Sequence, residues 1–580
     1  MKMSKTKTSL ICLVSLLSMA CSEKNISYGS KVEQVSIARV DSMPDMPGSY
    51  KMLDWEAKAK SFDSFVFDWN NKSEVGSMIW LDDSRRNIDQ PTFGLYTAVK
   101  DIRQGKNTNN GGEFHESLNS LAALLGAGGL VGIDKTNQDG YNYVKMVQNY
   151  FNKDNGWNIV MNNTTPEVGM LGGGYGRDWW YDVFPNALYY AVCDVFPNVD
   201  GAEQIQRSIA EQFVKADSVL AGNYDYSYFD YARMQGMVNH IPLQQDAAGG
   251  HAYVLLCAYN KFGDPRYLAH AKNATEALLS QKESRFYEIL LPLGVYAAAY
   301  LNATEGTNYD VQKLLDWTFD GCKNPDGRNG WGIIVGKWGD YEVNGLQGSI
   351  IDGGGYAFLM NSIKPAWPFV SMVKYEPQYA KAIGKWMLNN ANACRLFFPM
   401  EIDDEHQWDP EMKNITNDNI SYEGLRRVDD YGKASLKGKT PVALGDGPKW
   451  AKGNPPASMF SVYSSSPMGI FGAIIKETNV RGILQLNCNA TDFYAERHYP
   501  VYLYYNPHKE SKSVKYPAKD IVDLFDIVSK EYVAKNVSSD GVFEIPAGDA
   551  RIIVELPAGT KLATDNNKVV ADGKYTIAYK

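Results

Sequence analysis

The sequence predicts a mainly α-helical protein: an (α/α) toroid of helical hairpins, followed by a C-terminal antiparallel β-sandwich. The first observation is a repeated unit in which an apolar run, a short polar turn and a second, amphipathic run follow one another. The second is a change to short alternating segments near the C-terminus. Repeated helix pairs stack on their neighbours, because one pair cannot bury its apolar face alone.

The repeated unit is clearest between residues 252 and 398. Its helices are expected at 252–259 with 267–279, at 289–300 with 309–319, and at 369–374 with 379–398. Fainter copies pair 187–195 with 202–214 and 118–131 with 141–151. The turn residues Tyr267 and Tyr309 lie about 42 residues apart, a spacing typical of helical-hairpin repeats that form a solenoid or a closed toroid.

The C-terminal part has the short, turn-separated segments of an antiparallel sandwich. Strands are expected at 461–464, 469–476, 482–487, 500–505, 522–528, 542–545, 550–556 and 574–579. A composition change near Lys437 divides the chain into a toroid domain at 49–437 and a sandwich domain at 438–580. The sandwich is expected to be a stability module or a lid over one end of the toroid.

The N-terminus has the pattern of an export signal. Lys2, Lys5 and Lys7 precede an apolar run at 9–20 that is too short to span a bilayer, and Cys21 follows it. The pattern resembles a bacterial lipoprotein signal. The resemblance implies a signal peptide at 1–21, a lipid on Cys21, an outer-membrane anchor facing the periplasm or the cell surface, and a flexible tether at 22–48.

Composition limits the partners. The net charge of −9 argues against nucleic acid as a partner, because phosphate recognition needs a basic face. Aromatic residues make up 12% of the chain, and many lie in Gly-, Asp- and Asn-rich loops, where rings that stack on sugars indicate a glycan and ordinary packing is the alternative. The scattered Cys and His residues give no metal-binding pattern, so no metal and no cofactor are expected.

The strongest chemical signal lies in the glycine-rich segment 172–182. Arg177, Asp178, Trp179, Trp180 and Asp182 follow its glycines and open an apolar helix. Two carboxylates beside an arginine and two indoles are typical of a sugar site, although an aspartate in this place also serves as a helix cap.

Residues 180–191, with the sequence Trp-Tyr-Asp-Val-Phe-Pro-Asn-Ala-Leu-Tyr-Tyr-Ala, resemble the inner-helix motif of the six-hairpin glycosidases. The nearest pattern is that of the unsaturated glucuronyl and unsaturated rhamnogalacturonyl hydrolases. The resemblance implies that Asp182 is the general acid. The chain lacks the later Trp-Ala-Arg-Gly-x-x-Trp segment of those families, so the substrate stays open.

Other helix starts carry polar residues at equivalent points. If inner and outer helices alternate around a toroid, all inner helices begin at one rim, where Asp246, His251, Glu288, Asp352 and Tyr356 would join the glycine-rich segment. Each acid alone is also explained by the helix dipole. Together they suit glycosidic hydrolysis, which needs a proton donor and a second carboxylate, here Glu288 or Asp246 beside Asp182.

Two further groups are expected to bind substrate. Arg177 and His251 would orient it, since an arginine pairs well with a uronate carboxylate. The loop 321–348, with Trp338 and Tyr341, has no helical periodicity and is expected to form a mobile wall over the rim.

The sequence therefore predicts an exported glycoside hydrolase acting on a glycan that contains uronic acid. A polysaccharide lyase is the first alternative, with Asn239, His240 and Tyr356 as its candidate residues. A non-catalytic glycan-binding lipoprotein is the second.

Overall fold

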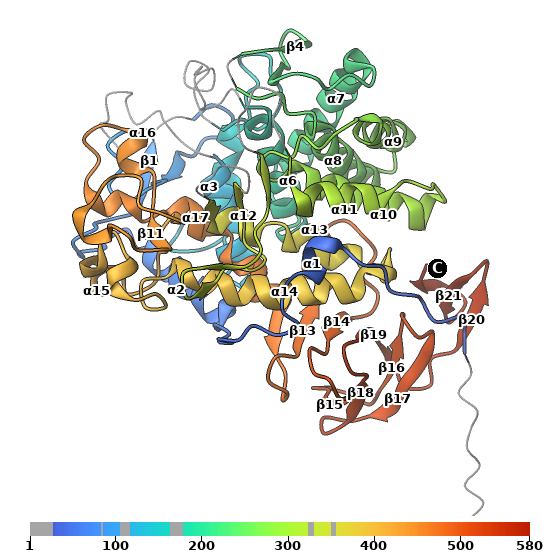
Figure 1. The fold of residues 1–580 in the computed structure, drawn as a ribbon. Helices are drawn as coiled ribbons and strands as arrows, with labels where there is room; N and C mark the ends of the chain where they lie inside the picture. Colours follow the sequence, from blue (N-terminus) through green and yellow to red (C-terminus); the bar gives the residue numbers. More distant parts are fainter. Residues whose placement is uncertain are drawn as a thin grey trace, which may run out of the picture.

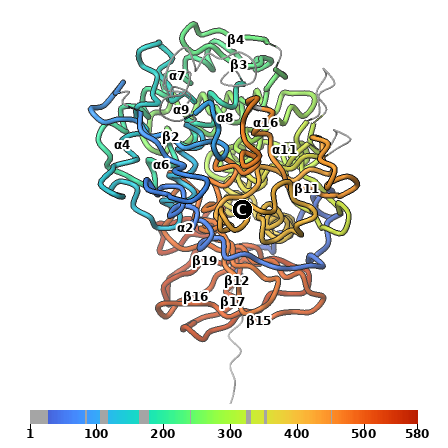
Figure 2. Tube along the Cα trace, turned by 90° about the vertical axis from the view of Figure 1, so that its left-hand side faces the viewer, coloured from blue at the N-terminus to red at the C-terminus, as the bar shows by residue number. Residues whose placement is uncertain are grey.

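The computed structural model describes residues 27–82, 85–104, 117–162, 178–239, 241–322, 330–349 and 355–579. Helices gather in one large body, and the C-terminal strands form a smaller one beside it (Figure 1). The tube view shows the same division from another side (Figure 2). The chain is thus helical first and β-structured last, as predicted.

A ring of inner helices forms the centre of the large body. Its members are α3 (Ser117–Ala122) with η1 (Ala123–Gly128), α6 (Trp179–Val195), α8 (Ala247–Phe262), α10 (Leu290–Glu305), α12 (Leu359–Ile363) with α13 (Ala366–Met372), and α17 (Val462–Ser465) with α18 (Gly469–Ile474). Each member contacts the next, and α18 contacts η1, so the ring closes. Helices α6, α8 and α10 are buried almost all round, which explains their continuous apolar runs.

An outer layer covers the ring. It consists of α2 (Trp55–Val66), α4 (Tyr143–Met146) with η3 (Val147–Tyr150), α7 (Ala202–Leu220), α9 (Pro265–Ser280), α11 (Val311–Asp320) and α14 (Ala380–Cys394). Local signals start several of these helices: Asp264 caps α9 by accepting from the main-chain N–H of Arg266, and Asp310 caps α11. The closed toroid is therefore confirmed. No described helix has both the length and the apolar composition that a membrane span requires.

The C-terminal body is an antiparallel sandwich. Its main sheet has the order β12 (Ile475–Glu477), β13 (Leu484–Asn487), β14 (Val501–Tyr505), β19 (Ala550–Pro557), β16 (Val522–Asp526) and β17 (Glu531–Val537). A two-stranded antiparallel sheet of β15 (Lys512–Lys515) and β18 (Val542–Ile545) lies against it, and β20 (Leu562–Asp565), β21 (Lys568–Ala571) and β22 (Tyr575–Ala578) form a third sheet. In β14, Leu503 and Tyr505 join the core shared with the barrel, whereas Tyr504 faces the core inside the sandwich.

Two expected strands are wrong. Residues 461–464 lie mostly in α17, and residues 469–474 are α18. The side chain of Ser461 caps α17 by accepting from the N–H of Ser464, 3.0 Å away. Both segments are helical because they fill the last place in the inner ring, between α12 and η1. The helical body consequently extends to Ile474.

Smaller sheets sit on the loops. Strands β11 (Val442–Leu444), β10 (Gly424–Arg426), β9 (Tyr356–Phe358), β8 (Gln347–Ser349) and β5 (Trp331–Ile333) form one antiparallel sheet, in which β9 leads directly into α12. Two-stranded hairpins are β1 (Ile79–Asp82) with β2 (Thr92–Leu95), β3 (Tyr228–Asp230) with β4 (Gln235–Met237), and β6 (Lys337–Trp338) with β7 (Tyr341–Glu342).

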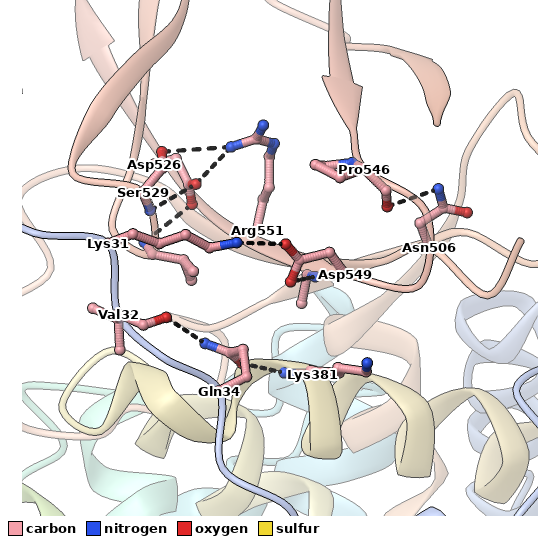
Figure 3. Close-up of polar contacts among 12 residues, drawn as sticks. Lys31, Val32, Gln34, Lys381, Asn506, Asp526, Ser529, Pro546, Asp549 and Arg551 are labelled. Carbon is pink, nitrogen blue, oxygen red and sulfur yellow. Dashed lines mark hydrogen bonds and ion pairs between the residues drawn. The ribbon is translucent and has the colours of Figure 1, made fainter. Parts of the chain in front are cut away.

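The N-terminal segment joins both bodies, as Figure 3 shows. The N–H of Val32 donates to the carbonyl of Val528, Lys31 pairs with Asp549 at 3.0 Å, and Gln34 accepts from the N–H of Lys381 at the start of α14. Further along, Ile37, Val40 and Met43 are buried. The flexible tether expected at 22–48 is therefore wrong for residues 27–48, while Cys21 lies outside the described residues.

The loop between β13 and β14 anchors the sandwich to the inner helices. The buried carboxylate of Asp492 accepts from the hydroxyl of Tyr296 in α10 at 2.6 Å and of Tyr375 at 2.8 Å, and it pairs with Lys374. The next residue, Phe493, packs on Trp367 of α13 with ring centroids 5.2 Å apart. The sandwich is thus fixed to the barrel by a buried ion pair.

We expect Asp492→Asn to destabilise the protein by about 3 kcal/mol, because it leaves the Lys374 ammonium buried without its counter-ion. Chemical denaturation measures this loss. Asp565→Asn, in the exposed strand β20, is the control and should change the free energy of unfolding little. Equal stability of the Asp492 variant and the native protein would contradict the anchoring role.

Candidate active site

The candidate site lies where the inner helices begin. Asp246 immediately precedes α8, Glu288 lies two residues before α10, and Trp180 lies in the first turn of α6. The N–H of Trp331 in β5 donates to the carbonyl of Phe286, so the sheet that contains β5 lies at the same end. The structure thus brings several of the predicted polar residues to one end of the barrel.

Glu288 is a buried ionisable residue at this end of the barrel. It is only 9% exposed, and its φ of 66° lies in the left-handed region, which is uncommon for a residue other than glycine. Its carboxylate accepts from the side-chain amide of Asn361 in α12. Burial raises the pKa of Glu288 to about 7, although Asn361 and the nearby Lys364 ammonium favour its charged form.

Lys364 supplies a cation at the same place. It follows α12 and is 2% exposed. Its ammonium lies 4.7 Å from the ring centroid of Phe184, 5.5 Å from that of Tyr463 and 5.9 Å from that of Trp180. A cation bordered by aromatic faces and a carboxylate is suited to an anionic, ring-shaped ligand.

Asp246 lies next to Glu288. Its Oδ2 accepts from the main-chain N–H of Tyr287 at 3.1 Å, which ties the start of α8 to the segment before α10. Burial raises the pKa of Asp246 well above its usual value, and the charge of Glu288 adds to this effect. Two adjacent carboxyl groups with raised pKa values are typical of acid–base sites.

Asp182 and Asp178 hold different positions on α6. Trp180 and Phe184, one turn apart, both approach Lys364, so Asp182 lies on the other side of the helix. Burial raises the pKa of Tyr231, and the charge of Asp182 also raises it. Asp178, directly before α6, accepts from the side-chain amide of Gln244 at 3.3 Å. Gln244 lies two residues before Asp246 in the sequence.

Trp179 and His251 belong to an aromatic cluster, separate from the residues around Lys364 and Glu288. Trp179 stacks on Tyr224, and its indole N–H donates to the hydroxyl of Tyr231. His251 stacks on Phe213, its Nε2 lies 2.8 Å from the hydroxyl oxygen of Tyr231, and burial lowers its pKa to about 3. Both side chains are 0% exposed and pack between α6, α7 and α8, and their contact with substrate stays a prediction.

The loop that was expected to be a substrate wall is built of short strands. Over residues 330–349 it contains β5 to β8, and Trp338 is only 6% exposed. The hydroxyl of Tyr341 donates to Asp403 at 2.6 Å, and its ring meets His406. In the described structure neither ring contacts Glu288, Asn361 or Lys364, and Tyr341 contacts Asp403 and His406 instead.

Tyr356 lies in β9 beneath the guanidinium of Arg426, which is 3.5 Å from its ring centroid. Burial raises its pKa well above the usual value. This environment disfavours the phenolate form that a lyase base requires. Arg177, His240 and Asp352 lie outside the described residues. The side chain of Asn239 accepts from the main-chain N–H of Ile241 at 2.7 Å.

Asn361 and Lys364 were not among the residues expected from the sequence. They stand three positions apart in a mostly apolar run at 357–373, in which Ser362 and Ser371 are the other polar residues, so they share one helical face. An amide and an ammonium inside an apolar helix were the signal that points to them, because such groups stay buried only with partners.

Comparisons with known proteins found solved structures that are similar to this chain at low scores. Neither a protein-family model nor a curated protein matches the sequence. A GH127 β-L-arabinofuranosidase from Geobacillus stearothermophilus T6 is similar in structure, with a TM-score of 0.37 and 10% identity over 90% of this chain and 85% of that one.

Two other solved structures are similar. An unsaturated glucuronyl hydrolase from Streptococcus agalactiae has a TM-score of 0.34 and 13% identity, over 77% of this chain and 98% of that one. A D-mannose isomerase has a TM-score of 0.37 and 14% identity, over 73% and 99%. At these scores the likeness carries no argument about activity, which depends on the residues of the site.

We expect the buried Glu288 to make stability depend on pH. Its pKa is raised from 4.5 to about 7, so its contribution is fully present below pH 4.5 and is lost as the pH rises through 7, by up to about 3 kcal/mol. Glu288→Gln should therefore flatten the decline of the melting temperature between pH 5 and about 8. Thermal melts at several pH values test this, with Glu496→Gln as the control, and an unchanged slope would contradict the burial of an ionisable Glu288.

Proposed function

We propose that the protein is a glycoside hydrolase in which Glu288 and Asp246 are the working carboxyl groups. One observation carries this proposal: two adjacent buried carboxyl groups, both with raised pKa values, stand at the starts of successive inner helices. Glycosidic hydrolysis needs one group that protonates the leaving oxygen and another that activates water or attacks the anomeric carbon.

The two environments support different roles. Burial and the neighbouring Glu288 charge raise the pKa of Asp246 well above its usual value and so favour its protonated form, which suits a general acid. Glu288 faces the Lys364 ammonium and the Asn361 amide, both of which favour its ionised form, so it suits the base or nucleophile. The family motif instead gives the acid role to Asp182, which makes Asp182 the rival of Asp246.

A uronic acid unit is the substrate that we propose for this site. The Lys364 ammonium would pair with the uronate carboxylate, and Trp180 would contact the apolar face of the sugar ring. We further propose that the protein is exported and anchored through Cys21, on the strength of the N-terminal sequence pattern alone.

Matched variants test the roles. Glu288→Gln and Asp246→Asn should each lower kcat by roughly two orders of magnitude or more on oligosaccharides that contain uronic acid, while Glu496→Gln should not. The native rate should also fall as the pH drops below about 7, because Glu288 becomes protonated. If Asp182→Asn abolishes turnover and Asp246→Asn does not, the acid is Asp182. Unchanged rates in the Glu288, Asp246 and Asp182 variants would overturn the assignment of the working carboxyl groups, and absence of turnover by the native protein would overturn the hydrolase.

Ultraviolet absorbance separates hydrolysis from β-elimination. A lyase creates a 4,5-unsaturated uronide that absorbs, whereas hydrolysis of a saturated chain produces a new reducing end and no chromophore. We expect reducing ends to accumulate from saturated uronate-containing glycans at constant absorbance, since Tyr356 is held in its protonated form. Rising absorbance would transfer the proposal to the lyase.

A further inference from the structure

A basic hollow lies in the loop that joins β10 to β11. It has a volume of about 490 Å³ and is formed by residues 427–440, between β10 and β11. Four basic side chains and one acidic side chain line it: Arg427, Lys433, Lys437, Lys439 and Asp429. We call this feature the basic hollow.

The basic hollow is connected to the site through the sheet. The main-chain N–H of Arg427 donates to the carbonyl of Gly355 at 3.0 Å, directly before β9. Strand β9 continues into α12, which carries Asn361 and is followed by Lys364. The N–H of Leu359, the first residue of α12, in turn donates to the carbonyl of Glu423, directly before β10. The register pairs Gly424 with Phe358 and Arg426 with Tyr356, so the hollow lies at the end of β9 away from α12. A chain molecule lying in the hollow would have to run along this three-residue strand to reach the end of the barrel where Glu288 lies.

Charge in the basic hollow is opposite to that of the whole protein. The segment 427–440 has four basic and two acidic residues, whereas the chain has a net charge of −9. Asp429 is occupied by the main-chain N–H groups of Tyr431 and Lys433, at 3.0 and 2.5 Å. Both of its carboxylate oxygens are thus hydrogen-bonded to the loop backbone.

Two of the cations are available to a ligand. Lys439 pairs with Glu405 at 2.7 Å, and Lys433 donates to the carbonyl of Trp408. Arg427 and Lys437 are exposed, and within the described ranges neither side chain has an ion pair or a hydrogen bond. Beside them Val428 is 54% exposed and offers an apolar contact. Exposed cations around an apolar contact suit an acidic sugar chain, whose rings carry both carboxylates and apolar faces.

We propose that the basic hollow binds an anionic polysaccharide, as an extension of the active site that holds the part of the chain outside the cleaved bond. The proposal rests on the proposed function only in taking this glycan to be the substrate. Binding itself needs no turnover, so it can be measured separately from hydrolysis.

The test is electrophoresis of the native full-length protein through gels that contain polygalacturonate or, in parallel, neutral amylose. The variant is Arg427→Gln with Lys437→Gln. The control is Lys509→Gln with Lys519→Gln, which removes the same charge from exposed positions of the C-terminal sandwich. We expect polygalacturonate alone to retard the native protein and the control, and the Arg427/Lys437 variant to bind it roughly three- to tenfold more weakly.

Three outcomes would overturn the proposal: equal retardation of native protein and variant, an equal loss in the control pair, or equal retardation by amylose. Stronger retardation by double-stranded DNA than by polygalacturonate would also overturn it, because the surface would then be a general polyanion site. Reducing-end release from a short uronide, measured on the same variant, keeps the two proposals apart. Normal release with weakened binding supports the basic hollow, and absent release in the native protein counts against the hydrolase alone.

Discussion

The close approach of the inner helices is the constraint on which the rest of the structure depends. A Cβ atom on Gly249 in α8 would lie 2.9 Å from the carbonyl oxygen of Leu290 in α10, and one on Gly469 would lie 1.1 Å from that of Gly126. Backbones therefore meet directly where α8 packs on α10 and where α18 closes the ring on η1. Only glycine allows this contact, and the resulting small ring brings the helix starts close enough to share one site.

The two ends of this ring have different tasks. Trp367 lies between them: its ring centroid is 6.0 Å from that of Phe184, which faces Lys364, and 5.2 Å from that of Phe493 in the sandwich loop. Ring contacts through Trp367, one tilted and one edge-on, thus join the residues around Lys364 to the C-terminal body. The sandwich is in this sense part of the barrel's support, which agrees with the buried Asp492 and with the N-terminal segment that crosses both bodies.

The predictability of the fold followed from periodicity. Helices α8 to α11 were expected correctly because their apolar runs are long and regular. Residues 461–464 and 469–474 were mistaken for strands because short segments rich in Ser and Gly have no helical period, whereas residues 475 and 476 do lie in β12. The two segments are helical because they complete the inner ring between α12 and η1. The prediction of a flexible tether was wrong for a similar reason. Residues 28–35 are held by main-chain hydrogen bonds, which the side-chain pattern of the sequence does not indicate.

The site was harder to predict because direction on a helix decides it. Asp246 and Glu288 were chosen for their places at helix starts, and their roles stay a prediction, whereas Trp179 and His251 pack into the cluster between α6, α7 and α8. Lys364 was not predicted as a site residue because its partners come from other helices.

The position of Glu288 also needs support that no local motif reveals. Its left-handed backbone is strained, and its carbonyl accepts from the side chains of both Gln347 in β8 and Asn361 in α12. The N–H of Gln347 in turn donates to Ser362 at 3.0 Å, so β8 and α12 brace each other around this residue. A strained, buried acid is unfavourable for folding, and it persists because the surrounding ring and sheet together fix it in place. That cost is understandable if Glu288 must change its protonation state in a site that excludes water, where its charge has the largest effect.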